Sequence, residues 1–212
     1  MDHEGRLEAD EGAPSLDDQR PKLRKRRQKV VLVRPAYSGI YRLFGKVPAD
    51  REVRPPLGLL SIAGSLRHAG HEVSVIDGEP RLLDTDGIVR EIVRREPAFL
   101  GVTSTTPEFC FAQDIVAGAK AALPGLVTVL GGAHASALPE ECLDATPGLD
   151  YVVVGEGENA MVDIVENRPR ERVLRPEPVK DLDLLPLPAR DLVDPDDYRY
   201  AAPREGLVTM DA

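Results

Sequence analysis

The sequence contains little cysteine and no excess of positive charge. Only two of its 212 residues are cysteines, Cys110 and Cys142, which are too few for a disulfide framework or for a cluster held by cysteines alone. Their spacing matches no zinc-binding pattern, so we interpret both as structural thiols. The formal net charge of −9 argues against a nucleic acid or an anionic membrane as the main partner.

Long apolar runs and several familiar catalytic motifs are also missing. No run approaches the ~20 apolar residues that a membrane-spanning helix needs, and the charged N-terminus is not typical of a signal peptide. We therefore expect a cytoplasmic protein. The sequence has no phosphate-binding P-loop, no histidine pair at H-x-x-x-H spacing and no G-x-S-x-G elbow.

Short apolar strand patterns alternate with helical patterns along most of the chain. Strands are expected at 29–34, 72–77, 99–103, 127–131 and 150–154, and helices at 57–69, 84–95, 109–123, from 140, and at 158–165. This alternation predicts an α/β fold in which helices cover both faces of a parallel sheet through right-handed crossovers. We predict a flavodoxin-like (Rossmann-like), doubly wound, five-stranded sheet, with strand order 2-1-3-4-5 by analogy.

The two ends of the chain differ in composition from this central part. Residues 1–28 mix acidic residues with Gly, Pro and Ser and close with a basic run, so we expect a disordered leader. Residues 29–166 form the predicted domain. Residues 167–212 are rich in Arg, Pro and Asp, and their repeated prolines predict an extended linker.

Glycines gather where the predicted fourth and fifth strands end. Gly131 and Gly132 close the fourth strand, and Gly155, Glu156 and Gly157 follow the fifth. Ligands of open parallel sheets bind at this edge, and glycines let a bulky ligand touch the backbone. The pattern predicts a platform for a large, flat ligand.

Polar side chains lie beside these glycines. Thr103, Ser104 and Thr105 follow the third strand, where hydroxyls cap the next helix, bind a ligand, or do both. His134 stands two residues beyond Gly132. Imidazole is a common metal ligand, but no partner stands at ligand spacing, so a histidine hydrogen-bonded within a loop remains the simpler interpretation.

Residues 155–160 formally match the dinucleotide pattern G-x-G-x-x-G/A. The pattern follows the fifth strand rather than the first, and Glu156 and Glu158 would place carboxylates where a pyrophosphate must lie. We therefore set a dinucleotide aside.

Taken in order, these motifs resemble a known family. The residues are Pro56-Leu-Gly-Leu, Gly70, Val75-Ile-Asp77, Gly131-Gly-Ala-His134, Pro139-Glu-Glu and Gly155-Glu-Gly-Glu158. They resemble the N-terminal cobalamin-binding domain of cobalamin-dependent radical SAM enzymes, a group that includes the anaerobic magnesium-protoporphyrin monomethyl ester cyclases, hopanoid methylases and related methyltransferases. The resemblance covers about residues 29–160, and residues 181–192 resemble the connector that follows that domain.

The resemblance implies a cofactor, a partner domain and a set of contact residues. Cobalamin would contact Pro56, Leu57, Gly58, Thr103, Ser104, Thr105, Gly131, Gly132, Ala133, His134, Pro139, Gly155, Glu156 and Gly157. No residue is expected to be catalytic or to bind a metal by itself. In full-length relatives a radical SAM domain in cis holds a four-iron four-sulfur cluster and S-adenosylmethionine. Its C-x-x-x-C-x-x-C motif is absent here, so we expect a fragment or a truncated reading frame.

A second missing motif bears on how cobalamin would be held. Methionine synthase-like modules supply the lower cobalt ligand from D-x-H-x-x-G after the first strand, yet no histidine stands between Arg34 and Arg67. The resemblance therefore implies cobalamin whose lower tail is swung away and is not replaced by such a histidine. The alternative is a cobalamin-free Rossmann-like module that binds a substrate, a nucleotide or a partner.

Overall fold

A single parallel sheet organises the protein. The computed structural model describes residues 26–36 and 52–198. The sheet has six strands in the order β2-β1-β3-β4-β5-β6. They are β1 (Lys29–Arg34), β2 (Glu72–Asp77), β3 (Phe99–Thr103), β4 (Val127–Gly131), β5 (Tyr151–Val153) and β6 (Val173–Leu174). The predicted fold class and the order of the first five strands are confirmed, and β6 is an addition.

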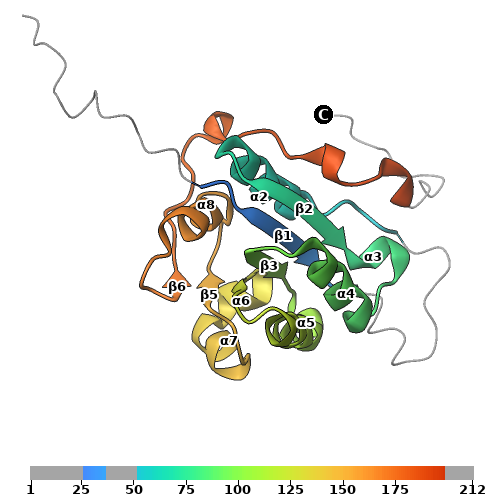
Figure 1. Cartoon of the computed structure of the whole chain (residues 1–212). Coiled ribbons are helices and arrows are strands. Elements are labelled where there is room, and N and C mark those ends of the chain that lie inside the picture. The colour runs from blue at the N-terminus through green and yellow to red at the C-terminus, as the bar shows by residue number, and fades with distance from the viewer. Residues whose placement is uncertain (1–25, 37–51, 199–212) are drawn as a thin grey trace, which may run out of the picture.

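Helices cover both faces of the sheet (Figure 1). One face packs against α2 (Leu57–His68) and α8 (Glu158–Asn167). The other packs against α4 (Thr85–Arg95), α5 (Phe109–Ala122), α6 (Ala133–Ala137) and α7 (Pro139–Ala145). The short α3 (Gly78–Arg81) follows β2, and neither it nor α6 was predicted. The structure is therefore doubly wound.

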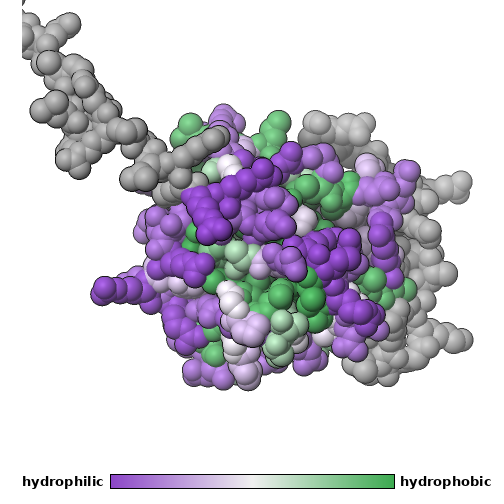
Figure 2. Space-filling model, in the orientation of Figure 1, coloured by the Kyte–Doolittle hydropathy of each residue, from purple (hydrophilic) through white to green (hydrophobic). Residues whose placement is uncertain are grey.

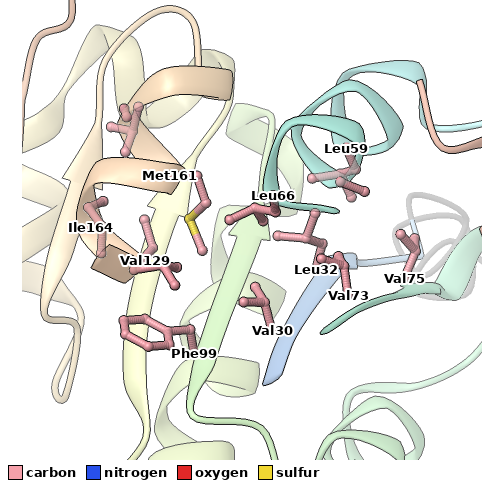
Figure 3. Close-up of a cluster of buried hydrophobic side chains, with 14 of the residues drawn as sticks. Val30, Leu32, Leu59, Leu66, Val73, Val75, Phe99, Val129, Met161 and Ile164 are labelled. Atoms are coloured by element: carbon pink, nitrogen blue, oxygen red, sulfur yellow. The ribbon is translucent and has the colours of Figure 1, made fainter. Parts of the chain in front are cut away.

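The strands are buried on both sides, as is usual for parallel sheets, so they appear in the sequence as continuous apolar runs. Val30 and Leu32 of β1 face α2 and α8, whereas Val31 and Val33 face α4 and α5. Figure 3 shows the first of these two cores, in which Phe99 is fully buried. Because side chains alternate along a strand, each of the strands β1 to β5 contributes to both cores.

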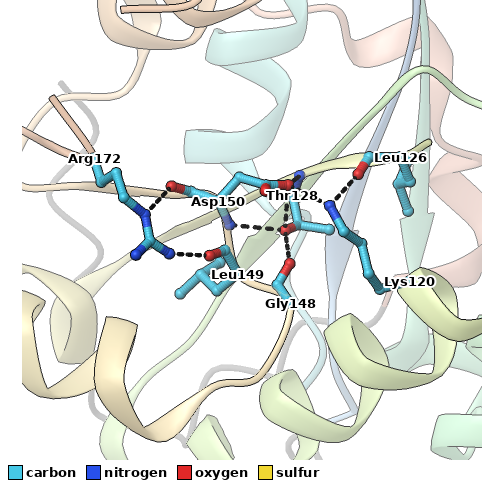
Figure 4. A network of polar contacts seen from close by, with 7 residues as sticks. All are labelled: Lys120, Leu126, Thr128, Gly148, Leu149, Asp150 and Arg172. Carbon is cyan, nitrogen blue, oxygen red and sulfur yellow. Dashed lines mark hydrogen bonds and ion pairs between the residues drawn. The ribbon is translucent and has the colours of Figure 1, made fainter. Parts of the chain in front are cut away.

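A polar network joins β4 to β5 and to the segment before β6 (Figure 4). The Asp150 carboxylate accepts hydrogen bonds from Lys120 Nζ (2.7 Å) and from the Thr128 amide (2.8 Å). Thr128 Oγ1 donates to the Gly148 carbonyl (2.6 Å), and Arg172 Nε donates to the Asp150 carbonyl (3.1 Å). The polar side chains of this network are thus hydrogen-bonded to one another and to the backbone, and the network fixes where β5 and β6 begin.

The segment predicted as a linker folds back onto the domain. We call its described part, residues 168–198, the connector. It contributes β6, which pairs with β5, and then the 3₁₀ turns η2 (Leu182–Leu184), η3 (Arg190–Leu192) and η4 (Pro195–Asp197). The strand-like pattern at 205–210 and the leader up to residue 25 lie outside the described residues.

The connector packs along α2, which it crosses in Figure 1. The Ala189 amide donates a 2.9 Å hydrogen bond to the Leu60 carbonyl, and Arg67 forms a 2.7 Å ion pair with Asp191. A Cβ on Gly64 would overlap the carbonyl oxygen of Leu187, so only glycine permits this contact. Among the described helices, none is both long and apolar enough to cross a membrane.

Candidate functional site

A cleft of about 410 Å³ opens at the carboxyl edge of the sheet, between α2 and α8. Except for Val102, the strand residues in its floor lie on the face of the sheet that α2 and α8 cover, because side chains alternate along each strand. They are Leu32, Arg34, Gly101, Thr103, Val129, Gly131 and Val153. In Figure 2 hydrophobic residues gather in the middle of the face shown, over the area where Figure 1 places β3 and α6, with hydrophilic residues around them.

Gly131 and Gly155 leave open space in front of the backbone. A Cβ added to either would meet no atom within 4 Å, although both residues line the cleft. Gly58, at the start of α2, is open in the same way. At these positions the lack of a side chain leaves open space, and that a ligand occupies this space stays a prediction.

Gly132 is required for a different reason. Its φ of +94° and ψ of −175° lie in a region that is essentially restricted to glycine. A Cβ would lie 2.6 Å from Thr103 Oγ1 and 2.7 Å from the Ser104 carbonyl oxygen. Gly132 therefore lets the loops after β3 and β4 approach each other. This corrects our interpretation that Gly132 keeps space free for a ligand, although it lines the cleft.

Contacts within the protein also account for Gly157 and Glu156. A Cβ on Gly157 would lie 2.6 Å from Ile62 Cδ1, so the glycine allows the start of α8 to pack on α2. Glu156 Oε2 accepts a 2.7 Å hydrogen bond from the Val179 amide of the connector. Both residues line the cleft, and Glu156 joins its rim to the connector.

A second hollow, of about 470 Å³, adjoins the cleft at Arg34 and Thr103, which line both. Ser104, Thr105 and Ala133 line the second hollow only. The Thr105 amide and Oγ1 donate to Glu108 Oε2 at 2.8 and 2.7 Å, so this hydroxyl belongs to a helix cap. Ser104 Oγ is buried without a hydrogen-bond partner in the described part of the chain.

His134 and Pro139 line neither hollow. His134 is 8% exposed, its Nδ1 lies 3.1 Å from Thr106 Oγ1, and its ring centroid lies 4.2 Å from that of Phe109. Pro139 is buried at the start of α7. Within the described residues, no group of three or more His, Cys, Asp or Glu side chains is placed to hold a metal ion.

Arg34 is a site residue that the sequence analysis missed. Its Nε and Nη2 donate to the two Asp77 carboxylate oxygens at 2.8 and 2.6 Å, and Nη2 also donates to the Arg54 carbonyl at 2.9 Å. Tyr198 of the connector donates a 2.9 Å hydrogen bond to Asp77 Oδ2. Burial, and then the negative charge of Asp77, raises the pKa of Tyr198 above its usual range, so its hydroxyl stays protonated and continues to donate.

The structure thus brings most of the predicted residues together. Those that line the cleft are Pro56, Leu57, Gly58, Thr103, Gly131, Gly132, Gly155, Glu156 and Gly157. Those that the sequence analysis missed are Leu32, Arg34, Leu59, Ile62, Gly101, Val102, Val129, Val153, Glu158 and Met161. Strand alternation, counted back from Gly131 and Thr103, would have placed Val129 and Gly101 on the same face.

Two solved structures share this fold. One is the radical S-adenosylmethionine methyltransferase TsrM from Kitasatospora setae, at 22% identity and a TM-score of 0.50, covering 65% of this chain and 25% of that one. The other is the cobalamin-dependent S-adenosylmethionine radical enzyme OxsB with bound aqua-cobalamin, at 16% identity and a TM-score of 0.55, covering 68% and 19%. At these identities the likeness establishes the fold.

Curated relatives are similar in sequence over a larger part of the chain. An uncharacterized methyltransferase of Pyrococcus horikoshii is 30% identical over 199 residues, which are 85% of this chain and 42% of the relative. The anaerobic magnesium-protoporphyrin IX monomethyl ester cyclase of Rubrivivax gelatinosus is 33% identical over 112 residues, 52% of this chain and 20% of the relative. The chain therefore spans less than half the length of these relatives.

The family model that matches the chain describes the B12 binding domain and covers residues 51–165. This range is more than half of the 212 residues and contains all the residues that line the cleft except Leu32 and Arg34 of β1. The chain belongs to the B12 binding domain family.

Proposed function

We propose that this chain is the cobalamin-binding module of a radical SAM-type enzyme. It would hold cobalamin across the carboxyl edge of the sheet, with the nucleotide tail in the cleft and no protein histidine on the lower face of cobalt. The observation that carries the proposal is the open space above Gly131 and Gly155, in the floor of an apolar cleft of a B12 binding domain.

The residues of the cleft fit part of this cofactor. Cobalamin consists of a corrin ring and a dimethylbenzimidazole nucleotide, joined by a phosphodiester. The cleft walls are mainly aliphatic, with Leu32, Leu59, Ile62 and Met161 among them, and such walls suit an aromatic base. The ring is larger than the cleft and would lie across the edge of the sheet, where hydroxyls after β3 can meet its amide side chains.

The positions of the histidines support the proposal that no histidine of the protein binds cobalt on the lower face of cobalamin. His134 is directed to Thr106 and Phe109. His71 accepts a 3.4 Å hydrogen bond from the Gln28 amide, at the amino end of β1, and His68 lies in the last turn of α2. None of the histidines within residues 26–36 and 52–198 lines either hollow.

When bound, cobalamin supplies a cobalt centre suited to carrying a methyl group or an electron. The residues of this chain bind and orient it. Relatives that are methyltransferases and cyclases, and that are more than twice as long as the matched part, support a larger enzyme. In it a radical SAM domain in cis, with its iron–sulfur cluster and S-adenosylmethionine, would act on the substrate.

Reconstitution with hydroxocobalamin tests the proposal. We expect the protein to retain about one equivalent through gel filtration and to be red. Electron paramagnetic resonance of the cobalt(II) form should lack nitrogen superhyperfine splitting. Such splitting would refute the tail-unbound arrangement, and a colourless protein would favour the cobalamin-free alternative.

A further inference from the structure

Arg34 stands at the junction of the two hollows. With Thr103 it lines both the cleft and the second hollow, so a ligand that occupies both must pass this side chain. Arg34 is the last residue of β1, on the same face of the sheet as Leu32. Of the described residues that line the cleft, it is the only basic one.

The guanidinium of Arg34 is held in place with donors to spare. An arginine has five N–H donors in a planar fork. Three are used, by the two Asp77 oxygens and the Arg54 carbonyl, through Nε and Nη2. The two donors of Nη1 make no hydrogen bond within the described part of the chain, and fork geometry directs them away from Asp77. The side chain is 21% exposed and that of Asp77 is 5% exposed.

We propose that Arg34 binds the phosphodiester that links the corrin ring of cobalamin to its nucleotide. This inference rests on the proposed function. A ligand made of two bodies joined by an anionic link would fill two adjoining hollows, with the link at the basic residue between them. Arginine suits this role because its guanidinium stays positively charged, and the spare donors of Nη1 can give charge-assisted hydrogen bonds to a phosphate oxygen.

Asp77 and Tyr198 are positioning residues in this arrangement. Asp77 fixes the plane of the guanidinium by accepting two of its N–H groups. Its Oδ2 also accepts the Tyr198 hydroxyl, and its Oδ1 accepts the Glu79 amide at 3.1 Å. These two further hydrogen bonds hold the Asp77 carboxylate in place. Because Asp77 in turn holds Arg34, the guanidinium keeps its position when an anion approaches.

The test compares two corrinoids. Hydroxocobalamin contains the phosphodiester and the nucleotide, whereas aquohydroxocobinamide lacks both. We expect Arg34→Gln to weaken hydroxocobalamin binding tenfold or more and to change aquohydroxocobinamide binding less than twofold. Raising the salt concentration should weaken hydroxocobalamin binding to the wild type more than to the variant, because a charge–charge contact is screened.

Two further variants exclude trivial causes. Arg34→Gln leaves Asp77 buried without its partner, so Arg34→Gln/Asp77→Asn removes both charges together. It should show the same selective loss; recovery of wild-type affinity would overturn the inference, because the loss would then come from Asp77. Arg94→Gln removes an exposed arginine of α4 and should leave both affinities unchanged.

The remaining outcomes also decide the question. If Arg34→Gln binds hydroxocobalamin like the wild type, or loses both corrinoids equally, the phosphate contact is refuted while cobalamin binding stands. If the wild type binds neither corrinoid, the proposed function fails, and this inference fails with it.

Discussion

The phenolic hydroxyl of Tyr198 donates a 2.9 Å hydrogen bond to Asp77 Oδ2, across 121 positions of sequence. Asp77 is also the partner of Arg34, which lines the cleft. This one carboxylate therefore connects the end of the connector with the edge of the cleft. A substitution of Asp77 is therefore expected to affect both the packing of the connector and the position of Arg34 at the cleft.

Tyr198→Phe should lower the free energy of unfolding by about 1 kcal/mol, the usual net contribution of one hydrogen bond. The difference should shrink at high pH. The pKa of Tyr198 is raised above its ordinary value of 10.0, so its contribution is fully present below pH 10 and is lost as the pH rises through the folded-state pKa. Denaturant unfolding at pH 8 and at pH 10.5 measures this. A difference that grows between these pH values would contradict the assignment.

Gly64→Ala should displace the connector from α2. The added methyl group would overlap the Leu187 carbonyl oxygen, and overpacking against backbone costs about 1–3 kcal/mol. Limited proteolysis within residues 181–198 and denaturant unfolding report the change. Gly58→Ala is the matched control, because it lies on the same helix and its added methyl group meets no atom within 4 Å. Equal proteolysis of both variants would show that the contact at Gly64 does not hold the connector.

Substitutions at Gly131 and Gly132 should separate binding from folding. Gly131→Val projects into open space, so it should preserve the melting temperature and abolish hydroxocobalamin retention. Gly132→Ala should destabilise the fold by about 1–3 kcal/mol, because its backbone conformation and the 2.6 Å approach to Thr103 exclude a side chain. Circular dichroism melting and cobalamin titration of each variant provide the readouts. Retention of cobalamin by a folded Gly131→Val protein would mean that the cofactor lies elsewhere.

His134→Ala should affect stability more than cofactor binding. The substitution removes the hydrogen bond to Thr106 and the ring contact with Phe109, at a cost of about 1–3 kcal/mol. The dissociation constant for hydroxocobalamin should change less than about threefold, with the cobalt(II) resonance spectrum unchanged. A hundredfold loss with an altered spectrum would instead identify His134 as a cobalt ligand.

Elements of this structure could be predicted from the sequence where a run of apolar residues ends at a proline or a glycine. The runs at 29–34 and 127–131 are apolar and stop at Pro35 or glycine, so their strands were predictable. A strand of two residues such as β6 is too short to show a pattern of apolar residues that would identify it in the sequence. Its place depends on β5, which it pairs with, and on Arg172, which contacts the backbone of Leu149 and Asp150.

The same distinction applies to the site. Gly131 and Gly155 could be predicted as cleft residues, because a glycine that follows a strand of a parallel sheet leaves the backbone open at the edge where ligands bind. Gly132 is also a glycine, but its role depends on its positive φ and on its close approach to the loop after β3. A single sequence reveals neither. Arg34 was missed because its partners, Asp77 and the Arg54 carbonyl, become neighbours only after folding.

Equilibrium dialysis of the purified chain against hydroxocobalamin tests the central claim most directly. We predict that the wild type binds about one equivalent saturably. Gly131→Val, at the same concentration of folded protein, should show no saturable binding. No saturable binding by a folded wild-type protein would contradict the account.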